Sequence, residues 1–126
     1  MLALVVDDSR AVRAILRGFL MEGGFQVLEA GHGREGLARL AERPEVGLAL
    51  VDWNMPVMDG LEFIQAVRAQ PEFRALRILM VTTETESSQV AKALAAGADE
   101  YLMKPFTKEI LLAKLSLMDA FAEPEV

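Results

Sequence analysis

Three aspartates in this chain follow runs of residues that are too apolar to include a carboxylate. Residues 2–6 lead into Asp7 and Asp8, and residues 47–51 lead into Asp52. Apolar residues at successive positions are typical of strands buried on both faces, which occur in parallel sheets. The carboxyl ends of parallel strands share one edge of the sheet, and ligands of open α/β folds bind there. We therefore expect the three carboxylates to lie close together at one edge.

A hydroxyl group and an ammonium group are predicted at the same edge. Thr82 is the last residue of the apolar run 77–82, and Lys104 follows the short run 101–103. Each residue alone has a simpler explanation, because strand-end threonines bond to backbone, surface lysines are common, and an aspartate after a strand often caps a helix. The functional hypothesis rests on the coincidence of five such residues at one edge.

These five side chains together favour phosphoryl chemistry. Two carboxylates about 4 Å apart repel each other by about 4 kcal/mol at an effective dielectric constant near 20, so a cation is expected. Mg²⁺ prefers a few carboxylate oxygens, keeps several waters and accepts a substrate phosphate. Lys104 adds a mobile positive charge and Thr82 a hydroxyl donor. The reaction that this set favours is attack by Asp52 on a phosphoryl group, which gives an aspartyl phosphate.

The elements that must position these groups alternate along the chain. Five strands are predicted, at residues 2–6, 25–29, 47–51, 77–82 and 101–103. Five helices are predicted between and after them, at residues 10–22, 34–41, 61–70, 86–96 and 108 to about 121. Ser9 and Thr107 are the predicted N-caps of the first and last helices. This alternation, with right-handed crossovers, predicts an α/β fold with a doubly wound, five-stranded parallel sheet and helices on both faces.

Other polar residues lie outside the five-residue set. Arg10, Arg13 and Arg17 are expected to face away from the apolar stripe of the first helix. His32 stands between two glycines and is expected to be exposed, without a role.

The composition limits the classes of function. A chain of 126 residues with 52% hydrophobic residues fits one domain, which we place at residues 1–122, with residues 123–126 as a short tail. A net charge of −6 provides no basic patch for DNA or RNA. The sequence has no cysteine, and no apolar run approaches the length of a membrane span. We expect a cytoplasmic protein whose partners are proteins or small ligands.

Five motifs occur in the order found in one protein family: VVDDS at residues 5–9, DWNMPVMDG at 52–60, MVT at 80–82, AGA at 96–98 and KPFT at 104–107. With these motifs the chain resembles the receiver domain of bacterial response regulators over essentially its whole length, and most closely the single-domain chemotaxis regulators. The resemblance implies a flavodoxin-like (βα)5 fold. It also implies a signalling protein that is phosphorylated by a sensor histidine kinase, a phosphotransfer protein or small acyl phosphates, and is an enzyme only toward its own phosphoryl group.

The resemblance assigns a role to each residue of the predicted site. It implies that Asp52 is the phosphoryl acceptor. It implies a Mg²⁺ ion held by Asp7, Asp8 and Asp52, with the backbone carbonyl of Asn54 as a further ligand. Lys104 is expected to contact the phosphoryl oxygens.

The resemblance also implies a conformational switch. Thr82 is expected to move toward the phosphoryl oxygens, and Tyr101 occupies the aromatic switch position. Asn54 and Glu84 match the chemotaxis pattern at two positions that modulate the lifetime of the phosphoryl group, so we expect fast autodephosphorylation. The peptide bond that precedes Pro105 is expected to be cis.

The predicted output face combines the fourth helix, the fifth strand and the fifth helix. Val90 and Leu94 lie one turn apart on the fourth helix, which suits the docking of a short amphipathic segment. Ile110 belongs to a second apolar set on the fifth helix, and Tyr101 lies on the strand between them. A partner surface, a dimer face and a wide buried stripe explain this second set equally well. We expect a monomer or a weak dimer.

Two other functions compete with a response regulator that acts on a protein target. An intermediate carrier in a phosphorelay would pass its phosphoryl group on to a histidine protein. A Mg²⁺-dependent phosphohydrolase with an aspartyl intermediate usually needs a second aspartate two residues after its nucleophile, and Asn54 stands there. A nucleotide-binding module is favoured less, because no glycine-rich phosphate loop follows the first strand.

Overall fold

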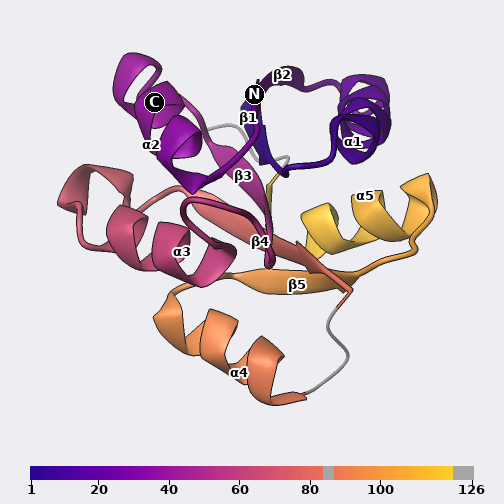
Figure 1. Ribbon diagram of the computed structural model, residues 1–126. Coiled ribbons are helices and arrows are strands. Elements are labelled where there is room, and N and C mark those ends of the chain that lie inside the picture. The colour runs from indigo at the N-terminus through magenta and orange to yellow at the C-terminus, as the bar shows by residue number, and fades with distance from the viewer. Residues whose placement is uncertain (84–86, 121–126) are drawn as a thin grey trace.

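A parallel sheet of five strands organises the molecule, with helices packed on both of its faces (Figure 1). The computed structural model describes residues 1–83 and 87–120. All strand pairs are parallel, and the strands lie in the order β2-β1-β3-β4-β5. Their bounds are Leu2–Val6 for β1, Gln26–Ala30 for β2, Leu48–Asp52 for β3, Arg77–Thr82 for β4 and Glu100–Met103 for β5. The predicted α/β doubly wound sandwich is confirmed.

Five α-helices follow the five strands in turn. Their bounds are Arg10–Glu22 for α1, Gly33–Glu42 for α2, Gly60–Arg68 for α3, Ser87–Ala96 for α4 and Lys108–Leu117 for α5, and a short 3-10 helix, η1, covers Pro71–Phe73. Helices α1 and α5 cover one face of the sheet, and α2, α3 and α4 cover the other (Figure 1). Ser9 and Thr107 cap α1 and α5 as predicted, since their hydroxyl oxygens accept the N–H groups of Val12 and Ile110.

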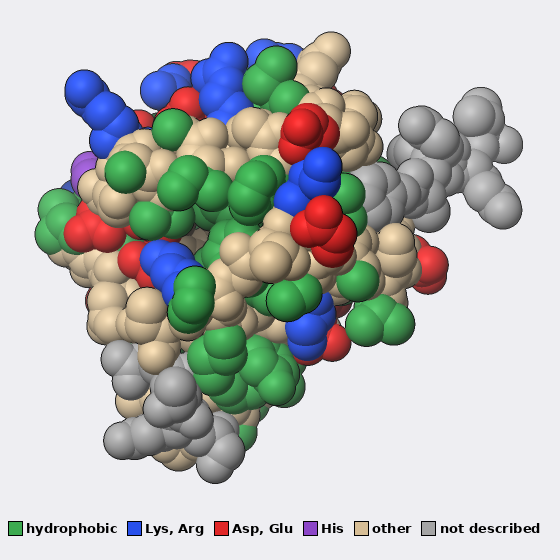
Figure 2. All heavy atoms as spheres, turned by 90° about the vertical axis from the view of Figure 1, so that its right-hand side faces the viewer, with side chains coloured by type: hydrophobic (Ala, Val, Ile, Leu, Met, Phe, Trp, Pro, Cys, Tyr) green, Lys and Arg blue, Asp and Glu red, His purple; other side chains and the backbone are tan. Residues whose placement is uncertain are grey.

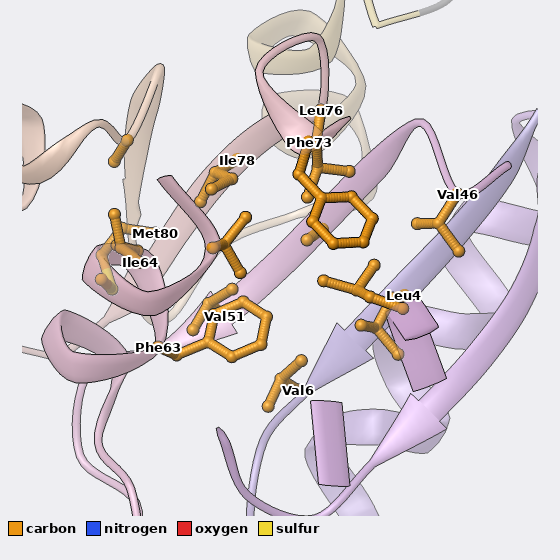
Figure 3. Close-up of a cluster of buried hydrophobic side chains, with 14 of the residues drawn as sticks. Leu4, Val6, Val46, Val51, Phe63, Ile64, Phe73, Leu76, Ile78 and Met80 are labelled. Atoms are coloured by element: carbon orange, nitrogen blue, oxygen red, sulfur yellow. The ribbon is translucent and has the colours of Figure 1, made fainter. Parts of the chain in front are cut away.

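Alternate residues of the inner strands enter two separate hydrophobic cores. In β1, Ala3 and Val5 belong to the core under α1 and α5, whereas Leu4 and Val6 belong to the core under the other three helices. Figure 3 shows the second core, in which Leu4 and Val6 point toward the region that also holds Phe63 of α3. Every residue of β1 and β3 is buried. This double burial explains why these strands have no polar position before their final aspartates.

Helix α5 ends earlier than predicted, at Leu117 instead of near residue 121. Asp119 has φ 56° and stands where a glycine usually reverses the chain after a helix. The Ala120 N–H donates to Leu115 O at 2.9 Å, and the Asp119 N–H donates to Ser116 O at 3.1 Å, which is the Schellman pattern of helix termination. The prediction was wrong because an aspartate forms this cap and no glycine marks it.

His32 has a structural role that the sequence analysis did not assign. Its ring is half-buried, and Nδ1 accepts the Glu35 N–H at 3.3 Å, which caps the start of α2. Several other predictions concern residues outside the described part of the chain. They are Glu84, the start of the fourth helix at residue 86, Phe121, the domain boundary at residue 122 and the tail.

Candidate functional site

Asp7, Asp8 and Asp52 meet at the carboxyl edge of the sheet, as the sequence predicts. One carboxylate oxygen from each of them lies within 4.8 Å of the other two. Asp7 is 1% exposed and Asp52 is 8% exposed, whereas Asp8 faces solvent. The group therefore consists of two buried carboxylates and one carboxylate at the surface.

Strand register brings the two buried aspartates together. In the parallel pair β1 and β3, Val6 lies opposite Val51, so the residues that follow them, Asp7 and Asp52, lie side by side at the carboxyl edge. Asp52 also pairs with Val81 of β4, which places it at the end of the central strand of the sheet. The position of Asp52 is therefore fixed by the pairing of β1, β3 and β4.

Lys104 joins the acidic group from the loop after β5. Its Nζ lies 3.1 Å from Asp7 Oδ2 and 3.3 Å from Asp52 Oδ1. Its backbone N–H donates to Thr82 O at 2.9 Å, which extends the pairing of β4 and β5 beyond the last strand residues. Thr82 is 2% exposed at the end of β4. The structure thus brings all five predicted residues to the same edge.

Burial and charge act in opposite directions on Asp52 and Lys104. Burial and the neighbouring carboxylate of Asp7 raise the pKa of Asp52 to about 6, although the Lys104 ammonium group lowers it in part. Burial by itself lowers the pKa of Lys104, but its contacts with Asp7 and Asp52 outweigh that effect, so the pKa of Lys104 is raised overall. The ammonium group therefore stays charged at neutral pH.

The donor set fits a hard divalent cation. Three carboxylates and one ammonium group carry three negative charges and one positive charge, which leaves two negative charges at the site. The candidate ligand atoms of Asp7, Asp8 and Asp52 are all carboxylate oxygens, which Mg²⁺ prefers over nitrogen or sulfur ligands. Asp8 is at the surface, so the group is open to solvent on one side. These features match a Mg²⁺ ion that keeps several waters.

Contacts behind Asp7 were missed by the sequence analysis. The Ser9 N–H donates to Asp7 Oδ1 at 2.8 Å, and Arg13 Nη1 donates to Asp7 O at 2.7 Å. Arg13 is itself held by Glu29, with Nε 3.1 Å from Oε1. Arg13 lies outside the apolar stripe of α1, and its side chain bends back to reach Asp7 and Glu29. Helical spacing gives no signal for this, since it does not show where a long side chain bends.

The turn after Asp52 has two unusual backbone features. A Cβ atom on Gly60 would collide with Asp52 O, so only glycine permits this close approach. Val57 has φ 68°, and the Met58 N–H donates to Pro56 O at 2.7 Å, which together describe a γ-turn. A β-branched residue is rare in this conformation. The turn therefore contains a strained valine five residues after Asp52.

Asn54 is exposed in this turn, close in sequence to Asp52. Thr83 is also exposed, directly after Thr82. The peptide bond between Lys104 and Pro105 is cis, as predicted.

The residues of the predicted output face differ in exposure. Leu94 on α4 is 41% exposed and Ile110 on α5 is 49% exposed, whereas Val90 and Tyr101 are half-buried. A wide buried stripe therefore does not explain Ile110. The side of the molecule that carries α1 and α5 shows hydrophobic side chains in a band interrupted by charged groups (Figure 2).

The strand order of the sheet and the acidic group at its carboxyl edge define a doubly wound α/β domain, and comparison with known families identifies the family. The sequence model of the response regulator receiver domain matches residues 3–116. The chain belongs to this family of signalling domains.

Several relatives of this chain are chemotaxis proteins. The chain is 41% identical to chemotaxis protein CheY1 of Helicobacter pylori over 116 residues. The matched region covers 91% of this chain and 94% of that protein. It is 44% identical to a CheY homolog of Campylobacter jejuni over 113 residues. This match covers 89% of this chain and 87% of that protein. The structure of CheY4 of Vibrio cholerae superposes with a TM-score of 0.86 at 40% identity, over 93% of this chain and 97% of that one.

Within residues 1–83 and 87–120, no helix has the length and apolar content required to cross a membrane.

Proposed function

We propose that this chain is the phosphoacceptor response regulator of a two-component system, with Asp52 as the acceptor. The observation that supports this most directly is the position of Asp52, a buried carboxylate that faces Lys104 and two further carboxylates. Membership of the receiver family supports a phosphoryl signal, and the chemotaxis relatives support a role in chemotaxis-like signalling. The protein acts in the cytoplasm as a monomer or weak dimer.

In the proposed reaction, an ionised oxygen of Asp52 attacks the phosphorus atom of a phosphohistidine on a kinase or phosphotransfer protein. The O–P bond forms as the N–P bond breaks, and the electron pair stays on the imidazole nitrogen of the donor, which takes up a proton. Water later attacks the phosphorus atom, which releases inorganic phosphate and restores the carboxylate. With a pKa of about 6, Asp52 is mostly ionised at pH 7.

Lys104 and the acidic residues neutralise charge in this reaction. The Lys104 ammonium group already contacts Asp52 Oδ1 at 3.3 Å, and it can turn to the phosphoryl oxygens while it remains near Asp7. Asp7, Asp8, Asp52 and the Asn54 carbonyl are the proposed ligands of Mg²⁺, which when bound supplies positive charge to the phosphoryl oxygens. Arg13 holds the backbone of Asp7 in place for this purpose.

The proposed switch starts at Thr82 and ends at Tyr101. A phosphoryl group adds roughly one to two negative charges and several acceptor oxygens at Asp52, to which the Thr82 hydroxyl donates. Movement of Thr82 leaves volume at the end of β4 for the ring of Tyr101, which lies on the neighbouring strand β5. This change alters the face formed by Val90, Leu94 and Ile110, where a protein target binds.

Intact-mass spectrometry tests the acceptor. After incubation with acetyl phosphate and Mg²⁺, the wild type is expected to gain the mass of one phosphoryl group, and Asp52→Asn is expected to gain none. Asp59→Asn is the matched control, because Asp59 belongs to the same turn but only caps α3. Equal phosphorylation of Asp52→Asn and the wild type would disprove the assignment.

We further propose that Asn54 and Glu84 give the phosphoryl group a short lifetime. The measurement is the loss of the phosphorylated mass after the donor is removed in Mg²⁺ buffer. A phosphoryl group that persists for hours under these conditions contradicts the proposal.

A further inference from the structure

Three residues form one interacting group between the start of β5 and the middle of α5: Glu100, Tyr101 and Lys114. The Nζ of Lys114 lies 4.5 Å from the centroid of the Tyr101 ring. The same ammonium group is 3.3 Å from Glu100 Oε1, and that oxygen also accepts the Tyr101 N–H at 3.0 Å. Glu100 therefore fixes the backbone of Tyr101 and the cation over its ring at the same time.

This arrangement favours the observed position of the ring. A cation over an aromatic face is attracted by the negative potential of the ring, and the attraction grows when the cation is partly shielded from water. The side chain of Lys114 is 25% exposed and that of Glu100 is 27% exposed, so the pair is partly shielded. The ion pair with Glu100 also limits the positions that the long lysine side chain can take, which keeps the ammonium group near Tyr101.

We propose that Lys114, held by Glu100, is a positioning residue for Tyr101 that sets the population of the alternative ring rotamer before any phosphoryl group is present. The proposal rests on the proposed function of Tyr101 as the switch. In this proposal the ring loses its contact with the Lys114 ammonium group when it turns toward the end of β4. The lysine therefore opposes the active rotamer and keeps the unphosphorylated output low.

The position of Lys114 makes this control independent of the acidic site. Lys114 lies on α5, and its charged contacts are with Glu100 and the Tyr101 ring. Asp7 and Asp52 are instead paired with Lys104. Changes at Lys114 are thus expected to shift the switch without altering the phosphoacceptor.

Three variants separate the contact from a general effect of charge. Lys114→Met removes the ammonium group but keeps most of the side-chain length. Lys114→Arg keeps a cation that can lie over the ring. Lys108→Met is the matched control, because Lys108 is on the same helix and its ammonium group pairs with Glu22 at 3.5 Å. Lys114→Met and Lys108→Met change the net charge by the same amount.

The sequence contains one tyrosine, so selective isotope labelling of tyrosine reports on Tyr101 alone. Three-bond couplings to the ring Cγ in NMR spectra give its χ1 rotamer populations, and they do not depend on the charge of neighbouring groups. In EDTA, without a phosphoryl donor, the ratio of minor to major rotamer is expected to rise about two- to fivefold in Lys114→Met. Lys114→Arg and Lys108→Met are expected to match the wild type.

Unchanged couplings in Lys114→Met, or an equal change in Lys108→Met, would overturn the proposal. Addition of Mg²⁺ and beryllofluoride, a phosphoryl mimic, to the wild type tests the proposed function separately. If the mimic leaves the Tyr101 couplings unchanged, Tyr101 is not the switch. If the mimic changes them but Lys114→Met does not, the role of Lys114 alone is refuted.

Discussion

Asp52 lies in an environment that disfavours its negative charge. Burial and the carboxylate of Asp7 disfavour the ionised form, and the contact with Lys104 offsets this only in part. The folded protein therefore binds a proton at Asp52 more tightly than the unfolded chain does. Below the pKa of an unfolded aspartate both states are protonated, and above about pH 6 both are ionised. As pH falls from 6 toward 4, this group makes the fold more stable.

Replacement of Asp52 by asparagine removes the energetic cost of a buried carboxylate beside Asp7. In EDTA at pH 7, Asp52→Asn is expected to raise the free energy of unfolding by about 1 to 3 kcal/mol relative to the wild type. The difference is expected to shrink as pH falls from 6 to 4, since the wild-type carboxyl group becomes protonated there. Urea denaturation at several pH values measures it. A difference that is constant with pH would show that the pKa of Asp52 is not raised.

Val57 contributes strain at the turn. Its φ of 68° is unfavourable for a β-branched residue, and its side chain is 69% exposed, so little packing compensates. Asparagine tolerates positive φ, so Val57→Asn is expected to stabilise the protein by about 1 kcal/mol. Val57→Thr keeps the β-branch and is expected to give no gain. Thermal unfolding of both variants checks this, and equal stabilities of the two would contradict it.

Arg68, the last residue of α3, binds to several segments that follow it in the chain. Its guanidinium group donates to the carbonyl oxygens of Gly97, Phe73 and Leu76 at 2.8 to 2.9 Å. It also pairs with Asp99 at 3.1 Å. These bonds join α3 to η1, to the segment before β4 and to the end of α4.

Lysine cannot reproduce this planar set of donors. Arg68→Lys is expected to lower the free energy of unfolding by about 2 to 4 kcal/mol, because several carbonyl oxygens lose their donors. Arg74→Lys is the control, since Arg74 is exposed, and a change within about 0.5 kcal/mol is expected there. Chemical denaturation measures both. A small effect at Arg68 would mean that water replaces the guanidinium group readily.

At the scale of the elements, the sequence predicted which helices and strands exist better than it predicted where they end. Strands β1 and β3 were evident because burial on both faces leaves no polar residue before Asp7 and Asp52. The end of α5 was not evident, since Asp119 adopts the conformation that a glycine usually provides. The contact of Arg13 with Asp7 was not evident, because the helical pattern gives directions from the helix axis and does not show where a long side chain bends.

At the scale of the whole molecule, the site follows from the direction of the strands. Asp7, Asp52, Thr82 and Lys104 come from four strands, and only a parallel sheet brings all four carboxyl ends to one edge. Their convergence was therefore predictable from strand pattern and order. The distances to Lys104 and the raised pKa of Asp52 were not, because they depend on side-chain packing.

A ligand bound at this edge stabilises the entire fold, since the four strands that carry the site pack together. Mg²⁺ at ten times its dissociation constant is expected to raise the free energy of unfolding by about 1.4 kcal/mol. Asp8→Asn is expected to lose this gain while it remains folded, because Asp8 is at the surface. Thermal unfolding with and without Mg²⁺ measures the effect. An equal gain in Asp8→Asn would place the ion elsewhere.

The ion pair between Asp7 and Lys104 also has a consequence for the growing polypeptide. The two residues are 97 positions apart in the sequence. At a synthesis rate of about 5 to 20 residues per second, Lys104 follows Asp7 by about 5 to 20 s. During that interval Asp7 and Asp52 exist without Lys104, so the proposed phosphoacceptor site is incomplete in the nascent chain. Under the proposed function, a kinase meets a competent acceptor only after the fifth strand has been made.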